Sequence, residues 1–312
     1  MMTEIKILTQ DHYMLSARHF IPADPNGHVV IINSATGVKQ NFYGHFAAYL
    51  ASQGHHVYTY DYRGIGGSRG GSLKNFEATI ADWGELDLTA VIKYVRQRHP
   101  IHSISIVGHS IGGQIIGLSP LSSIVDSIVM VGAQTPFWRH YRGTMLLKVW
   151  HLWHVMIPIL TGAFGYFPAR SLGLFEDLPR AAALQWARWG KSRNYLFDEL
   201  PEKKELFSSL QQPALVYSFT DDQFAPRDAV DDLLSHYSNL NIEHRHINPI
   251  SLNRKSIGHF NFFRKSSEGI FWSKISDWLK GAREKKLRTQ DSYNEVNSKQ
   301  RDETYHMRDM RQ

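Results

Sequence analysis

The sequence of 312 residues contains no cysteine. Disulfide bonds, thiolate nucleophiles and cysteine-ligated metal sites are therefore excluded. The first residues carry neither the basic segment nor the apolar stretch of a secretory signal, so we expect a cytoplasmic protein. No cluster of histidine and carboxylate residues has the spacing typical of a metal site, and nothing in the sequence calls for a cofactor.

Long apolar runs are also scarce. The most apolar segment, residues 145–160, is interrupted by Lys148, His151 and His154, and it contains Pro158, which is expected to break a helix. The segment is too short and too polar to cross a bilayer, so we expect no transmembrane segment. Helices that pack over the core are the simplest interpretation.

Positive charge is in modest excess, with a formal net charge of +6. Basic surfaces attract nucleic acids and anionic membranes. Part of the excess lies near the C-terminus, where residues 280–312 hold nine Lys or Arg against six Asp or Glu and almost no aliphatic residues. Such a composition buries too little apolar surface to offset chain entropy. We therefore predict a polar, disordered tail at 281–312 and no nucleic-acid partner, and the oligomeric state stays open.

Segments with strand and helix patterns alternate along the first part of the chain. The first two predicted strands alternate in polarity and are typical of an antiparallel pair, whereas the later ones are continuous apolar runs, typical of buried parallel strands. The pattern predicts an α/β fold with a mostly parallel, doubly wound sheet. The expected strands are residues 4–8, 13–20, 28–32, 56–60, 103–107, 124–131, 213–219 and 242–247.

The alternation stops at residue 134, and residues 134–211 are rich in tryptophan and phenylalanine. Insertions at this point of an α/β sheet lie beside the carboxyl ends of the strands, where ligands bind. We therefore predict a helical cap at 134–211 that lines an acyl or aromatic pocket. Residues 1–133 and 212–280 are expected to form the core domain.

A G-x-S-x-G motif, Gly108 to Gly112, stands between the apolar strand 103–107 and the helix-compatible segment 113–118. Strand, motif and helix in this order are the context of a nucleophile elbow. Glycines two positions either side of the serine permit a sharp, strained turn that exposes its hydroxyl. We predict that Ser110 is a nucleophile rather than part of a structural turn.

A serine nucleophile needs a base, and the base needs an acid to orient it. On such a sheet the partners follow later strands in the order serine, acid, histidine. Of the later histidines only His259 stands in a loop between the last strand and the last helix, which makes it the candidate base. The others fall on a helix, within a strand or in the tail: His236, His244, His246 and His306.

Two adjacent acids, Asp221 and Asp222, follow the strand at 213–219 and compete for the orienting role. In the pattern Asp-x-x-x-Pro, Pro226 starts the next helix and favours Asp222, which leaves Asp221 as a turn residue. The oxyanion of an acyl transfer needs two backbone donors. We expect the amide of Ile111, directly after the nucleophile, and that of Val38 to supply them.

The glycine-rich loop at residues 61–68 lacks the G-x-G-x-x-G spacing of a dinucleotide site, so we interpret it as structural. Together with Ser110, Asp222 and His259, residues 61–66 resemble the α/β-hydrolase superfamily. Three further segments are similar to a little-characterised bacterial branch near the serine-aminopeptidase and monoacylglycerol-lipase-like hydrolases: residues 35–38, 186–189 and 257–263. The likeness covers about residues 5–280. One departure is Thr36-Gly37, where many relatives have His-Gly.

The resemblance implies the α/β-hydrolase fold and a Ser-His-Asp triad that cleaves a carboxylic ester through an acyl-enzyme. The expected partner is a small-molecule ester or acyl substrate. An acyltransferase or a peptidase would use the same residues, and a non-catalytic binding protein would keep the fold without the chemistry. Dehalogenase and epoxide hydrolase chemistry on this fold uses an aspartate at the elbow, where this sequence has Ser110.

Overall fold

The computed structural model describes residues 1–284. Most of the tail predicted at 281–312 lies outside the described residues. Residues 281–284 continue the helix that starts at residue 273. Arg283 in this last turn donates a hydrogen bond to the backbone carbonyl of Asn26.

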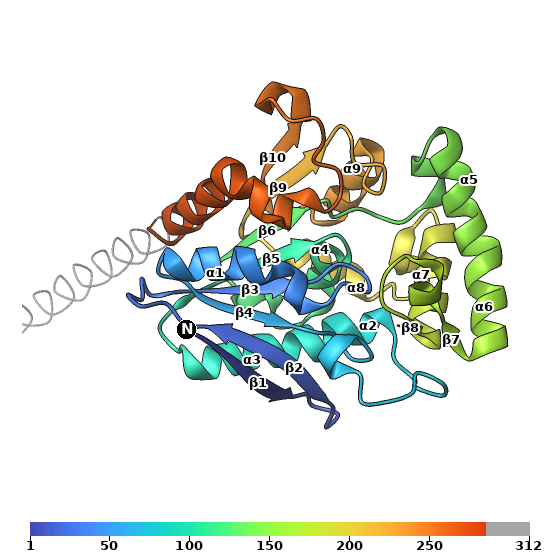
Figure 1. The fold of residues 1–312 in the computed structure, drawn as a ribbon, viewed down its shortest axis with the longest axis horizontal. Coiled ribbons are helices and arrows are strands. Elements are labelled where there is room, and N and C mark those ends of the chain that lie inside the picture. Colours follow the sequence, from blue (N-terminus) through green and yellow to red (C-terminus); the bar gives the residue numbers. More distant parts are fainter. Residues whose placement is uncertain (285–312) are drawn as a thin grey trace, which may run out of the picture.

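Within the described residues the main sheet has eight strands in the order β1-β2-β4-β3-β5-β6-β9-β10 (Figure 1). β1 pairs antiparallel with β2, and β2 pairs antiparallel with β4. All other neighbours are parallel, which confirms the predicted mostly parallel sheet. The strands are β1 (Met2–Leu8), β2 (Met14–Phe20), β3 (His28–Asn33), β4 (His56–Tyr60), β5 (Ser103–His109), β6 (Ser127–Val131), β9 (Pro213–Phe219) and β10 (Asn241–Ile247), with a separate pair β7 (Tyr166–Phe167) and β8 (Leu178–Pro179).

Apolar side chains cover both faces of the sheet, as continuous apolar strands require. On β3, Val29 and Ile31 belong to one buried cluster, whereas Val30 and Ile32 belong to the cluster on the opposite face. The first cluster includes α3, and the second includes α1 and the C-terminal helix. The helices are α1 (Gly44–Ser52), α2 (Ile80–Asp82), α3 (Thr89–Arg98), α4 (Ile111–Gln114), α5 (Gly143–His151), α6 (Ile157–Phe164), α7 (Arg180–Lys191), α8 (Lys203–Ser209) and α9 (Arg227–His236).

The helix after β5 is shorter than the predicted segment at 113–118. α4 ends at Gln114 and continues as a 3₁₀ turn, Ile115–Leu118. The hydroxyl of Tyr237 donates to the carbonyl of Gly113 at 2.9 Å and accepts from the amide of Gly117 at 2.9 Å. In a continuing α-helix these two backbone groups would form a hydrogen bond with each other. The tyrosine hydroxyl therefore takes the place of one backbone hydrogen bond of the helix.

Contrary to the expectation of a segment too short and too polar to cross a bilayer, the most apolar helix of the described residues runs unbroken from Gly143 to Phe164, and by length and composition it could span a membrane. Contrary to the expectation from sequence, Pro158 does not break it, because a π-helical turn, Leu152–Met156, precedes the proline. One side of the helix is buried, and it contacts α7. This buried stripe has one residue at every fourth position: Val149, Trp153, Ile157 and Thr161.

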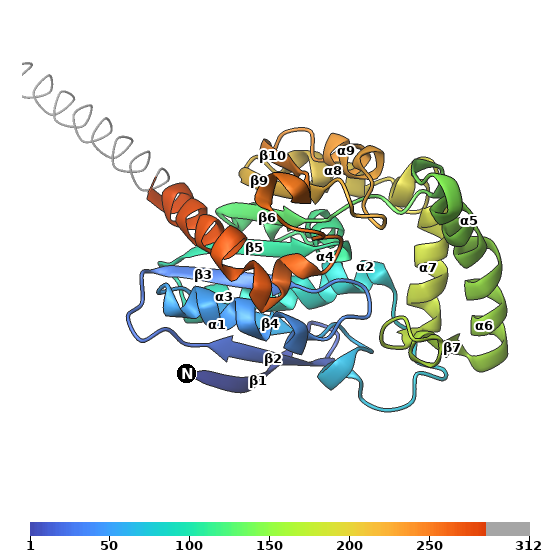
Figure 2. The same cartoon turned by 45° about the horizontal axis from the view of Figure 1, so that its top comes forward.

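Helices α5, α6 and α7 lie beyond one end of the strands, on the right-hand side of Figures 1 and 2. By contrast, α8 packs against the 3₁₀ turn after α4, and its Phe207 stacks on Tyr237 with ring centres 4.6 Å apart. Within the segment at 134–211, the part up to α7 therefore projects over the sheet edge. The domain boundaries themselves stay a prediction.

The glycine-rich loop at residues 61–68 is held by buried carboxylates. Asp61 accepts hydrogen bonds from the amides of Gln40 and Gly67 at 2.7 and 2.8 Å. Arg63 Nε lies 2.7 Å from Asp87 Oδ1, and both side chains are buried. These contacts support the structural interpretation of the loop. They also fix the chain around Gln40, whose neighbours Lys39 and Asn41 line the pocket described below.

Candidate active site

The serine of the G-x-S-x-G motif sits at the carboxyl end of β5 in a strained conformation. Ser110 has φ 54° and ψ −119°, and α4 begins at the next residue. A Cβ atom on Gly108 would lie 2.6 Å from the carbonyl oxygen of Gly112, and one on Gly112 would lie 2.4 Å from that of Asn33. Only glycine fits at both positions, and the backbone strain at Ser110 is worth about 1–3 kcal/mol.

His259 and Asp222 form the pair predicted for the base and its orienting acid. His259 Nδ1 lies 2.8 Å from Asp222 Oδ2, and both side chains are buried. The other carboxylate oxygen, Oδ1, accepts from the amides of Phe224 and Ala225 at 2.9 and 3.0 Å. Among residues 1–284, His259 Nε2 takes part in no hydrogen bond, with Ser110 or with any other residue, so it is available to accept a proton.

The neighbouring acid, Asp221, has a different role. Its Oδ2 accepts three hydrogen bonds from the loop before the histidine, from Ser256 Oγ and from the amides of Ile257 and Gly258, at 2.8 to 3.0 Å. Asp221 therefore holds the loop that presents His259, while Asp222 contacts the ring itself. The geometry favours the second of the two acids, as the position of Pro226 predicts.

Ser110, Asp222 and His259 all lie at the same edge of the sheet, because each follows the carboxyl end of a parallel strand. β5 lies beside β6, and β6 lies beside β9, so their carboxyl ends meet at one edge of the sheet. The ring of His109, directly before Ser110, lies 5.0 Å from the ring of His259. His109 Nε2 also donates to the backbone carbonyl of His259 at 2.8 Å, which places the histidine loop against the elbow.

A buried chain of hydrogen bonds joins this loop to the loop after β3. His109 Nε2 carries a proton, because it donates to a carbonyl; Nδ1 then accepts from the Tyr43 hydroxyl at 2.8 Å. Tyr43 in turn accepts from the amide of Ala35 at 2.8 Å. Burial, with the nearby His259, holds the pKa of His109 well below its ordinary range, which keeps the ring neutral as this chain requires. Sequence patterns alone gave no sign of Tyr43 or His109 in these positions.

We expect Tyr43→Phe to lower kcat for ester substrates about tenfold and to leave KM within about threefold. The substitution leaves the Ala35 amide and His109 Nδ1 without a buried partner, which also costs about 1–3 kcal/mol of stability. Steady-state kinetics and urea unfolding measure the two effects. Tyr49→Phe, on a residue of α1 that lies outside this chain, is the control. An unchanged kcat in Tyr43→Phe would show that the chain does not position the site.

The structure corrects one of the two predicted oxyanion donors. The amide of Val38 donates to the carbonyl of Ala35 at 3.0 Å and closes a turn, so it is not free. Gly37 at the third position has φ 64°, as a type II turn requires. Gly37 was the feature of the sequence from which this turn could have been predicted. Among the described residues the Thr36 amide donates to no acceptor, and the Ile111 amide is the first of α4, without a partner in the helix.

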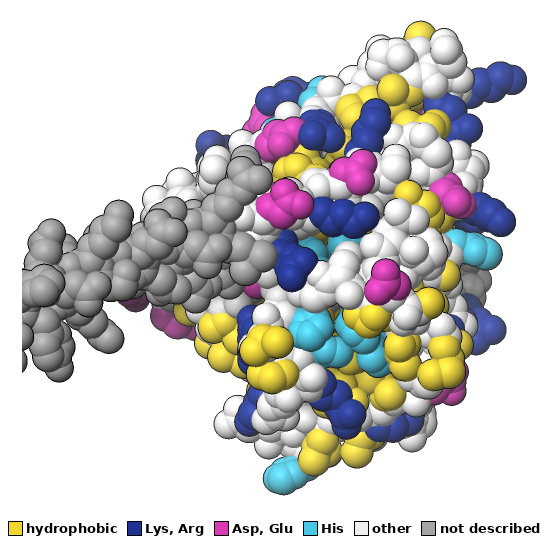
Figure 3. Space-filling view, turned by 90° about the vertical axis from the view of Figure 1, so that its left-hand side faces the viewer, with side chains coloured by type: hydrophobic (Ala, Val, Ile, Leu, Met, Phe, Trp, Pro, Cys, Tyr) yellow, Lys and Arg dark blue, Asp and Glu magenta, His cyan; other side chains and the backbone are white. Residues whose placement is uncertain are grey.

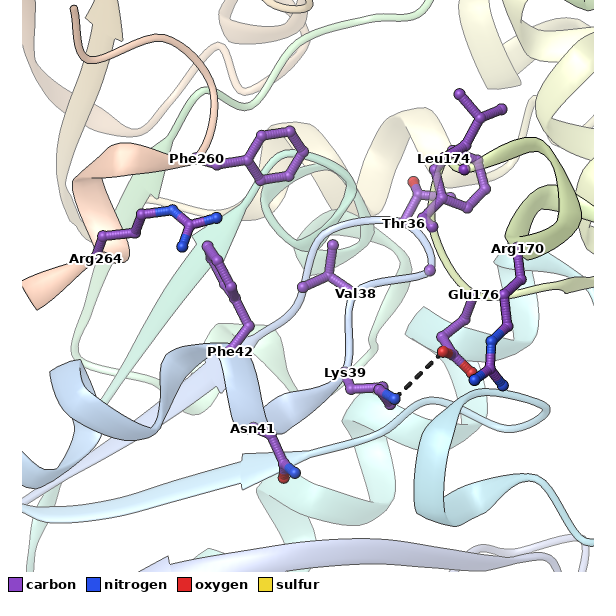
Figure 4. A pocket seen from close by; sticks show the side chains of 13 residues that line it. Thr36, Val38, Lys39, Asn41, Phe42, Arg170, Leu174, Glu176, Phe260 and Arg264 are labelled. Atoms are coloured by element: carbon purple, nitrogen blue, oxygen red, sulfur yellow. Dashed lines mark ion pairs between the residues drawn. The ribbon is translucent and has the colours of Figure 1, made fainter.

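A pocket of about 580 Å³ opens beside the loop after β3 (Figure 4). Its walls come from that loop, from the segment between β7 and β8, and from residues after His259. Lys39 and Glu176 form an ion pair of 3.3 Å across one side. The other labelled side chains include apolar groups and two cations: Val38, Phe42, Leu174, Phe260, Arg170 and Arg264.

Comparison with known proteins agrees with the fold described above. A family model described as the alpha/beta hydrolase fold matches residues 27–149. The structure is similar to an esterase from Pyrococcus furiosus, at 17% identity and a TM-score of 0.61, over 90% of this chain and 91% of that chain. It is also similar to a thermostable carboxyl esterase from Bacillus coagulans, at 12% identity and a TM-score of 0.62, over 90% and 98% of the two chains. An esterase from Exiguobacterium antarcticum gives 17% identity and a TM-score of 0.58, over 89% and 100%.

The chain therefore has the α/β-hydrolase fold, and the predicted resemblance to that superfamily is confirmed. No protein of curated function matches the chain by sequence. The particular bacterial branch suggested by residues 35–38, 186–189 and 257–263 stays a prediction.

Proposed function

We propose that this protein is a serine hydrolase that cleaves carboxylic esters. The observation that carries the proposal is the strained Ser110 at the same sheet edge as a His259 ring whose Nδ1 is bound to Asp222 at 2.8 Å. This is the arrangement of nucleophile, base and orienting acid that acyl transfer needs. The esterases named above support an ester as the bond that is cleaved. A cytoplasmic location stays a prediction.

In the proposed mechanism Ser110 Oγ attacks the ester carbonyl while His259 Nε2 takes its proton. The imidazolium forms with Nδ1–H still donated to Asp222, which stabilises the charge. Collapse of the tetrahedral intermediate breaks the ester bond, and Nε2–H protonates the departing alkoxide. Water then attacks the acyl-enzyme, again with His259 as base, and releases the carboxylic acid and the free serine.

The developing oxyanion would bind to two backbone amides. Ile111, the donor expected from the sequence, would supply one at the start of α4. Thr36 replaces Val38 as the second donor, because the Val38 amide is occupied by Ala35. Thr36 Oγ1 is buried and has no hydrogen-bond partner among the described residues, so the side-chain hydroxyl of the same residue is a further donor.

The pocket next to this loop is the proposed site for the acyl group. Phe42, Leu174 and Phe260 supply apolar surface, and a volume of about 580 Å³ is within the range of small-molecule sites. Each methylene buried in such a pocket contributes about 0.8 kcal/mol.

We expect kcat/KM for p-nitrophenyl esters to rise by up to about fourfold per methylene from acetate through butyrate to hexanoate, and then to level off as the pocket fills. Phe260→Ala should flatten this rise, whereas an exposed residue away from the pocket, as in Ile101→Ala, should not. Flat and feeble rates for all chain lengths would contradict an ester-cleaving role. Added alcohols or amines that divert the acyl group into new esters or amides would instead identify an acyltransferase.

A further inference from the structure

Histidines gather at the edge of the sheet opposite the candidate active site. His56 begins β4, His19 lies near the end of the antiparallel β2, and His99 directly follows α3. Ser110 follows the carboxyl end of β5, whereas these residues meet at the amino end of β4. Figure 3 shows histidine side chains together in the middle of this face.

The three rings bring their nitrogens close together. One ring nitrogen from each of His19, His56 and His99 lies within 4.8 Å of the other two, and all three residues are half-buried. His19 Nε2 and His56 Nδ1 are 3.0 Å apart. Two imidazoles on a tetrahedral zinc, with bonds of about 2.0–2.1 Å, have nitrogens about 3.3 Å apart. This pair is therefore close to the spacing that a shared metal ion needs, and the remaining ring nitrogens lie within 4.8 Å.

Neighbouring residues hold the rings in place. Tyr58 stacks on His19 with ring centres 4.2 Å apart, and its hydroxyl lies 2.8 Å from His99 Nε2. His102 adds a fourth imidazole 5.1 Å from the His99 ring, and its Nδ1 is buried without a partner among the described residues. A buried ring nitrogen with no partner is costly unless a ligand satisfies it.

No carboxylate of the described residues forms an ion pair with His19, His56 or His99. Burial, and after it the neighbouring histidines, lowers the pKa of His19 and of His99 to about 4. The rings are therefore neutral near pH 7, the form in which imidazole binds a metal. The positive charge of Arg98 lies near the same rings and weakens the attraction for any cation, so we expect a site of moderate affinity.

We propose that His19, His56 and His99 form a binding site for a divalent transition-metal ion, with zinc as the expected ion. Three imidazoles and an open fourth position suit Zn²⁺, Ni²⁺ and Cu²⁺, whereas Mg²⁺ and Ca²⁺ prefer oxygen ligands. The ligands come from β2, β4 and the end of α3. A bound ion would therefore join the antiparallel strand β2 and its neighbour β4 to the end of helix α3. This site lies at the end of the sheet opposite the candidate active site.

The spacing of these histidines, 19, 56 and 99, explains why the sequence predicted no metal site. Recognisable zinc motifs bring ligands in close pairs along the chain. Here each ligand comes from a different element, and only the pairing of β2 with β4, which places His19 opposite Tyr58, brings them together.

The test is a titration of the purified full chain with Zn²⁺ against a chromophoric chelator, with Mg²⁺ as a second titrant. We expect one Zn²⁺ per chain and no binding of Mg²⁺ at the same concentrations. His56→Ala and His99→Ala should each weaken Zn²⁺ binding by more than about tenfold, because loss of even an outer-shell partner of a metal costs about 10- to 100-fold. His45→Ala, on an exposed histidine outside the cluster, should leave the affinity unchanged.

Circular dichroism checks that each variant is folded, and His99→Gln replaces His99→Ala if the alanine variant is not. Zn²⁺ should also raise the melting temperature of the wild type but not of the folded cluster variants. Binding that survives in both His56→Ala and His99→Gln, or a stoichiometry well below one, would overturn the site. The result does not depend on ester hydrolysis, because Ser110 takes no part in it.

Discussion

Ser110→Ala is expected to lower kcat for p-nitrophenyl butyrate by at least about 10³-fold, because the variant has no atom to form the acyl-enzyme. Residues of a triad act as a unit, and loss of the nucleophile removes nearly all of their contribution. The residual rate would come from the oxyanion donors and from binding. The measurement is steady-state hydrolysis followed at the p-nitrophenol absorbance.

Stability should change little in this variant. Alanine at residue 110 meets the same strain at φ 54°, and the Ser110 hydroxyl makes no hydrogen bond to the described residues that would be lost. Ser52→Ala, on an exposed serine of α1, is the matched control and should keep full activity. Retention of more than a tenth of the wild-type kcat in Ser110→Ala would assign the nucleophile to another residue.

The second large effect distinguishes the two adjacent acids. Asp222→Asn should lower kcat about 10³- to 10⁴-fold, whereas Asp221→Asn should lower it less than about tenfold. Asp222 Oδ1 accepts from two backbone amides, so the asparagine oxygen must stay there and its NH₂ group must face His259 Nδ1. Nδ1 would then have to be the acceptor, with the proton on Nε2, and that tautomer cannot take a proton from serine.

The same substitution at Asp221 meets a different environment. Its Oδ2 accepts all three hydrogen bonds from the 256–258 loop, and an asparagine oxygen can accept them as well. The expected result is a modest loss of stability with the tautomer of His259 unchanged. Comparison of kcat for the two variants under the same conditions tests the assignment. Equal losses, or a larger loss in Asp221→Asn, would reverse the roles of the two acids.

Much of the fold was predictable because parallel strands buried on both faces leave continuous apolar runs. β3 and β5 were found in this way, and the elbow follows from glycines whose Cβ atoms would collide with the backbone. His259 was chosen as the candidate base by elimination, since a base must stand in a loop at the same edge of the sheet; the structure places it against Asp222, and its role as base stays a prediction. In each case a pattern within a short stretch of sequence follows directly from the position of that stretch in the fold.

The features that the sequence analysis predicted wrongly or missed have a different physical cause. Tyr237 reaches α4 from a distant part of the chain and shortens it, and the π-helical turn before Pro158 lets a helix continue where a local rule ends it. Val38 was a wrong choice because its amide already closes the turn from Ala35, which Gly37 signals locally. The Tyr43–His109 link and the histidine cluster depend on contacts between distant elements, which no local pattern contains.

The most direct test of the account is labelling with a fluorophosphonate, which forms a covalent bond with an activated serine. Intact mass spectrometry of the folded wild-type protein should show one added phosphonyl group per chain, and peptide mapping should place it on Ser110. Ser110→Ala should stay unlabelled, and Asp222→Asn should react much more slowly. Failure of the folded wild type to react, or equal labelling of Ser110→Ala, would contradict the assignment of Ser110 as an activated nucleophile.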